Sequence, residues 1–93
     1  MLDARGRAIG VVMISRGTLT SSLVHPREVF APAISARAAS IILAHNHPSG
    51  DPSPSDEDFE LSERLKVAGA VLGIPVVDSL VLGDDEFTSV LHR

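Results

Sequence analysis

The stretch SIILAHNHP, residues 40–48, decides the fold of this chain. Its apolar part, residues 41–44, is flanked by Ser40 and by the polar run His45-Asn46-His47. A short continuous apolar run is typical of a strand buried inside a sheet, whereas a half-exposed strand alternates apolar and polar residues. Pro48 ends the strand. The two histidines therefore lie at its carboxyl end, where open α/β sheets place their sites.

The segments around this stretch predict a single α/β or α+β layer structure. The expected order is β-β-α-β-loop-α-β-β, because two strand-like segments and a helix come before the stretch, and a second helix and two strands follow it. Pro26 suits a first helical position, and Pro32 is expected to bend or restart that helix. The expected elements are strands at residues 8–14, 41–44, 76–82 and 87–91, an extended piece ending at Leu23-Val24, and helices at residues 26–39 and 55–73.

Length and composition limit the possible classes of protein. The 93 residues make one domain, residues 1–93, and the absence of cysteine excludes disulfides and cysteine-based zinc sites. Twelve acidic against eight basic residues give a net charge of −4, which argues against a nucleic-acid binder. No apolar run approaches the roughly 18–20 residues that span a bilayer. We therefore expect a cytoplasmic protein with no membrane partner and no direct nucleic-acid partner.

His45, His47 and Asp58 have the spacing of a metal site. In a strand, residues i and i+2 point to the same face, so the two imidazoles can converge on one ion. Asp58 follows in the first turn of the next expected helix, where it faces back toward the strand end. Two imidazoles and one carboxylate leave a fourth position for water, as in catalytic zinc sites. The other interpretation is structural: Ser55-x-x-Asp58 also fits a capping box, and the histidines can be polar residues without a ligand role.

These residues also carry a family resemblance. His-x-His-Pro with Ser-x-x-Asp resembles the JAMM (MPN-plus) metalloprotease motif, and the strings at residues 24–30, 44–51 and 73–75 resemble the RadC branch of that superfamily. The resemblance implies a cytidine-deaminase-like three-layer MPN/JAB fold, with a mixed sheet flanked by helices. It makes His45, His47 and Asp58 the ligands of one zinc ion per chain, and Ser55 the residue that stabilises the oxyanion. Members of the superfamily cut peptide or isopeptide bonds, so it implies a peptide or protein substrate.

The chain departs from the family pattern in three places. RadC-like proteins usually carry an N-terminal helix-hairpin-helix region, and the family's catalytic glutamate lies just upstream of the first strand. Both are absent here, which predicts a domain truncated at that strand. Ser79 stands where the family tends to have histidine. Glu28 is the only glutamate before His45 and is the candidate general base, although an acid there also suits a helix start. His25 is interpreted as a helix-start residue.

Three functions compete. The first is a zinc-dependent hydrolase of JAMM type, a metallopeptidase or isopeptidase in which zinc-activated water attacks an amide bond. The second is a non-catalytic MPN-like protein-interaction module associated with DNA repair, the role in the old label of the RadC branch. The third is an HNH nuclease, which the net charge disfavours, and which spreads its three residues over a ββα unit rather than along one strand. The substrate and the oligomeric state do not follow from the sequence.

Overall fold

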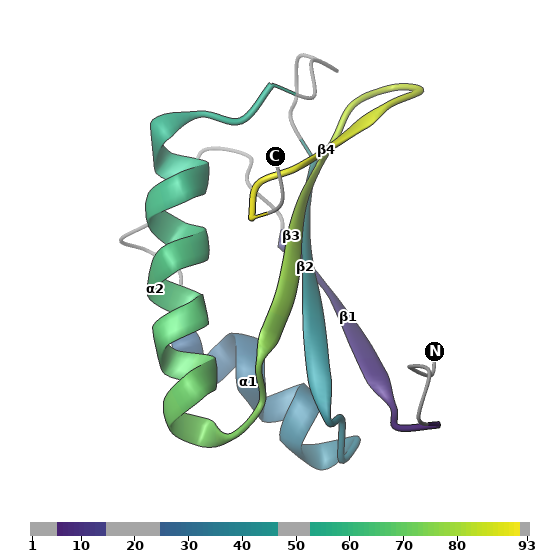
Figure 1. Cartoon of the computed structure of the whole chain (residues 1–93), viewed down its shortest axis with the longest axis vertical. Helices are drawn as coiled ribbons and strands as arrows, with labels where there is room; N and C mark the ends of the chain where they lie inside the picture. Colours follow the sequence, from purple (N-terminus) through teal and green to yellow (C-terminus); the bar gives the residue numbers. More distant parts are fainter. Residues whose placement is uncertain (1–5, 15–24, 47–52, 92–93) are drawn as a thin grey trace.

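Four strands and two helices follow one another along the chain in the computed structural model, which describes residues 6–14, 25–46 and 53–91 (Figure 1). The strands form one mixed sheet in the order β1-β2-β3-β4, in which β1, β2 and β3 are parallel and β4 is antiparallel to β3. The expected α+β class with a mixed sheet is confirmed, and within the described residues both helices pack on one face of that sheet. The elements are β1 (Ile9–Ile14), α1 (Pro26–Ser35), β2 (Ser40–Asn46), α2 (Asp56–Leu72), β3 (Val76–Leu82) and β4 (Phe87–Ser89).

One face of the sheet packs against both helices. Figure 1 shows α2 running alongside β3 and β2, and the side chains of both helices meet the sheet in one apolar core. Phe30 of α1 is 1% exposed, and its ring lies against Gly69 of α2. The opposite face of the sheet is more open, since Val11 and Met13 of β1 are 53% and 55% exposed. The core members with the lowest exposure are Phe30, Ile41, Leu43, Leu61, Leu65 and Val81.

β2 is the central strand, as its apolar run predicts. It lies between β1 and β3, and His45 is in register with Ile14 on one side and Val81 on the other. Alternation along the strand places His45 on the same face as Ile41 and Leu43, both of which are fully buried. The His45 side chain therefore points toward the helices, at the carboxyl end of a buried strand.

α1 is shorter than expected, because it ends at Ser35 rather than at Ala39. It continues through Pro32 as one helix, so the expected restart does not occur. Its end is a Schellman motif: the amide of Arg37, which has a φ of 55°, donates to Ile34, and the amide of Ala38 donates to Ala33. A non-glycine residue in the left-handed region is uncommon, which is why the sequence pattern did not mark this end.

α2 begins and ends as expected. Ser55 is its N-cap, and Gly73 closes it with a φ of 75°, a conformation that favours glycine. The hairpin of β3 and β4 is also confirmed, although β4 ends at Ser89 rather than at Leu91. The expected extended piece at Leu23-Val24 lies outside the described residues. No helix within the described ranges is long and apolar enough to cross a membrane.

Candidate metal centre

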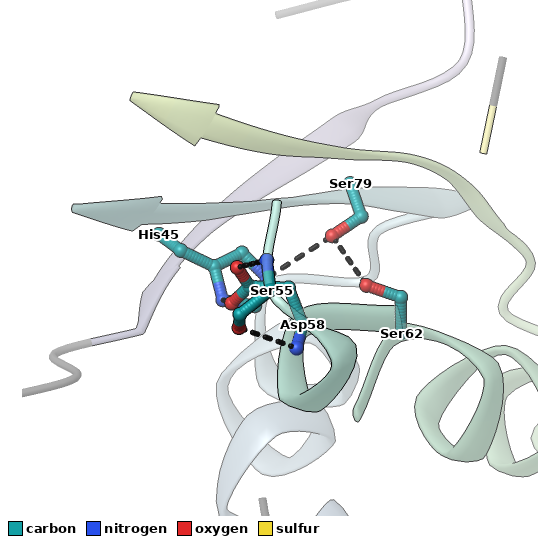
Figure 2. A network of polar contacts seen from close by, with 5 residues as sticks. All are labelled: His45, Ser55, Asp58, Ser62 and Ser79. Carbon is teal, nitrogen blue, oxygen red and sulfur yellow. Dashed lines mark hydrogen bonds and ion pairs between the residues drawn. The ribbon is translucent and has the colours of Figure 1, made fainter. Parts of the chain in front are cut away.

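His45 is buried at the carboxyl end of β2, and its side chain is 0% exposed. Its two ring nitrogens face different elements, as Figure 2 shows. Nε2 lies 3.0 Å from Oγ of Ser79 on β3, within hydrogen-bond distance, and Nδ1 faces Asp58 at the start of α2. The ring is therefore held between the sheet and the first turn of a helix.

Asp58 is fully buried as well, at the third position of α2. Oδ2 of its carboxylate accepts a hydrogen bond of 2.8 Å from the Ser55 amide, and Oγ of Ser55 accepts one of 3.2 Å from the Asp58 amide. These two bonds form the capping box that the sequence predicts. Because capping occupies Oδ2, the other oxygen, Oδ1, can face His45. The capping and ligand interpretations of Asp58 are thus compatible with each other.

The pair formed by His45 and Asp58 fits a shared metal ion. Nδ1 lies 3.7 Å from Oδ1, and both side chains are 0% exposed. Zinc binds imidazole nitrogen and carboxylate oxygen at about 2.0–2.2 Å, so two tetrahedral ligands lie about 3.3–3.5 Å apart. A small displacement of either side chain would bring both atoms to an ion between them. The donor set, one imidazole nitrogen and one carboxylate oxygen, is also one that zinc uses.

His47, the third expected ligand, lies outside the described residues. Within the described residues no group of three or more acidic, histidine or cysteine side chains could hold a metal. His45 and Asp58, two of the three expected ligands, lie next to each other, and the i, i+2 spacing from His45 is the reason to expect the third.

The other predicted site residues lie in different surroundings. Ser55 is exposed at the N-cap of α2, next to Asp58. Glu28 is exposed in the first turn of α1, on a different element from His45 and Asp58. His25 is the N-cap residue of α1 and is exposed, and its side chain makes no capping hydrogen bond. The structure thus brings together His45, Asp58 and Ser55, and it places Glu28 and His25 on α1.

Two residues of the network were not predicted. The hydroxyl of Ser62 donates to Oγ of Ser79 at 2.8 Å, and both side chains are 0% exposed (Figure 2). Ser62 lies one helical turn after Asp58, so both point to the same side of α2. The sequence does hold a signal: each serine stands among residues that pack in the core, where an apolar side chain is usual.

Comparison with known proteins places the chain in a family. All 93 residues match the family model described as "RadC-like JAB domain". The chain is 56% identical over 93 residues to "UPF0758 protein STH371" of Symbiobacterium thermophilum and 50% identical over 93 residues to "UPF0758 protein" of Pelobacter propionicus. It covers 40% and 41% of those two proteins. The expected resemblance is confirmed: the chain belongs to the RadC-like JAB domain family, which is part of the JAMM/MPN superfamily.

Proposed function

We propose that this domain is a zinc-dependent hydrolase of JAMM type that cleaves an amide bond in a peptide or protein. His45, His47 and Asp58 would hold one zinc ion per chain. When bound, zinc would supply a Lewis acid that polarises a carbonyl and activates water. The observation that supports this proposal is the buried pair of His45 and Asp58, whose facing atoms are 3.7 Å apart.

Ser55 is the proposed oxyanion donor. Its Oγ accepts a hydrogen bond from the Asp58 amide, which leaves the hydroxyl proton to be donated elsewhere. A donor beside the reacting carbonyl stabilises the negative charge that develops on its oxygen in the transition state. The capping box holds this hydroxyl and the Asp58 carboxylate in a fixed relation, so one local motif positions two groups of the site.

Zinc content before and after chelation tests the metal site. We expect one zinc per chain, lost when His45→Ala and His47→Ala are combined, while most of the fold survives because the apolar residues 41–43 of β2 remain. His25→Ala is the matched control, since this histidine is exposed on α1. Stoichiometric zinc in the double variant would contradict the proposed ligands.

A protein-interaction module is the second candidate. The observation that favours it is the open face of the sheet, where Val11, Met13 and Val77 are 53%, 55% and 41% exposed. Exposed apolar side chains that gather on one face are typical of protein contacts. Turnover of a peptide- or isopeptide-linked substrate separates the two candidates, because an interaction module binds without cleaving.

A further inference from the structure

A chain of buried hydrogen bonds supports the ring of His45 on the side away from Asp58. Ser62 of α2 donates to Ser79 of β3 at 2.8 Å, and Oγ of Ser79 lies 3.0 Å from Nε2 of His45. All three side chains are 0% exposed. The hydrogen bonds therefore join β2, β3 and α2, the three elements that surround the candidate metal centre (Figure 2).

The two serines occupy positions where the fold otherwise uses apolar residues. Ser62 follows Leu61 on the buried side of α2, and Ser79 alternates with Val81 on the helix-facing side of β3. A buried hydroxyl costs stability unless it is hydrogen-bonded, so each serine needs the partner that it has here. Together they provide a polar contact to one atom, Nε2 of His45.

We propose that Ser79, held in place by Ser62, is a positioning residue that fixes the His45 ring so that Nδ1 faces Asp58 as the metal-binding nitrogen. This inference rests on the proposed function, because it assigns one atom of the proposed zinc site. It adds a residue on β3 to a site otherwise built from β2 and the start of α2.

The two hydrogen bonds at Ser79 accommodate this assignment. A neutral imidazole binds a metal through its unprotonated nitrogen, so the ring proton must then be on the other nitrogen. With the metal on Nδ1, Nε2 would carry the ring proton and would donate a hydrogen bond to Oγ of Ser79. This oxygen has two lone pairs, and it then accepts from both Ser62 and His45. The partner of the second ring nitrogen generally fixes the tautomer and orientation of a ligand histidine.

Four serine variants of the 93-residue chain test the proposal. Ser79→Ala removes the acceptor, Ser79→Thr keeps a hydroxyl on a strand residue, and Ser62→Ala removes only the support. Ser35→Ala, an exposed serine at the end of α1, is the control. We expect Ser79→Ala to weaken zinc binding about 10–100-fold, and Ser62→Ala to weaken it less. We expect Ser79→Thr and Ser35→Ala to bind like the parent chain.

Nitrogen-15 NMR of the imidazole, with spin-active cadmium in place of zinc, identifies the bound nitrogen. We expect coupling between cadmium and Nδ1 of His45, and a proton on Nε2. Cadmium on Nε2, or unchanged affinity and tautomer in Ser79→Ala, would overturn the proposal. If Ser79→Ala does not fold, the zinc affinities of Ser62→Ala and Ser79→Thr test the proposal instead. Parent-like zinc affinity in Ser62→Ala would overturn the proposal.

The metal-free chain separates this proposal from the proposed function. Its His45 tautomer populations should change in Ser79→Ala and return in Ser79→Thr, whether or not any metal binds. A parent chain that takes up no zinc but shows this change would overturn the proposed function, and with it the metal-binding role of Nδ1, and would leave intact the positioning of the ring by Ser79. A parent chain that binds zinc and shows no change would overturn the positioning role of Ser79 alone.

Discussion

Glu28 and Asp58 occupy the same position in their helices, the third residue after the N-cap, yet their surroundings differ. Glu28 follows His25, whose side chain makes no capping bond, and its own side chain is exposed. Asp58 follows Ser55 in a complete capping box and is 0% exposed. An acid in a first turn is favoured by the helix dipole in both cases. The difference arises from what each helix start faces.

The start of α2 faces the carboxyl end of the central strand. His45 lies there, and Nδ1 of its ring is 3.7 Å from Oδ1 of Asp58. Burying a carboxylate is costly unless hydrogen bonds and an opposite charge compensate it, and here the Ser55 amide supplies one such bond at 2.8 Å. A first-turn acid is thus a ligand candidate where the fold places another donor opposite it, and a local helix-stabilising residue elsewhere.

The largest expected effect is on zinc affinity. Asp58→Asn exchanges an anionic oxygen ligand for a neutral one, so we expect affinity to fall by about 100-fold or more. Glu28→Gln makes the same chemical change at the matching position of α1, and we expect affinity within about twofold of the parent chain. Competitive zinc titrations of the two variants measure both. Equal affinities would end the ligand assignment of Asp58 and remove the proposed difference between the two helix starts.

The second largest expected effect is on the stability of the fold, and it distinguishes the two N-cap residues, Ser55 and His25. Ser55→Ala removes the side-chain cap of α2 and should lower the free energy of unfolding of the metal-free chain by about 0.5–2 kcal/mol. It should leave zinc affinity nearly unchanged, since the hydroxyl is not a ligand, and reduce any turnover about 10²–10³-fold.

His25→Ala is the matched control for Ser55→Ala. The His25 side chain makes no capping bond, so we expect His25→Ala to change the free energy of unfolding by no more than about 0.5 kcal/mol. Denaturant melts of the chelated chains, with zinc titrations, measure both variants. A large loss of zinc affinity in Ser55→Ala would contradict the expectation that Ser55 caps α2 without contributing to zinc binding.

Much of the fold follows from local patterns in the sequence. The apolar run at Ile41 predicts the central strand, and Ser55 and Gly73 mark the ends of α2, because capping and left-handed glycine are local requirements. The end of α1 did not follow, because Arg37 takes the left-handed position that glycine usually occupies. Sequence patterns fail where one residue adopts a conformation that its type rarely uses.

The candidate site was less predictable than the fold. His45 and Asp58 stand out by spacing, since strand alternation puts His45 on the buried face of β2 and the capping pattern puts Asp58 in the first turn of α2. Ser79 and Ser62 do not stand out by spacing, because their contact depends on how α2 packs on β3. The two serines are 17 residues apart along the chain. Their place among core residues marks both serines as polar exceptions in the sequence, and only the tertiary arrangement shows that they reach the ring of His45.

The smallest expected effect concerns Glu28 itself. If the Glu28 carboxylate acts only through the dipole of α1, Glu28→Gln should lower the free energy of unfolding by about 0.3–1 kcal/mol at low salt. The loss should shrink at high salt, because an exposed charge is screened. Denaturant melts of the chelated chain at two ionic strengths measure this. If Glu28 is the general base, the same variant should reduce turnover by about 10²–10⁴-fold with zinc still bound. Because the Glu28 side chain is exposed in the first turn of α1, on a different element from His45 and Asp58, we expect the stability effect and no such loss of turnover.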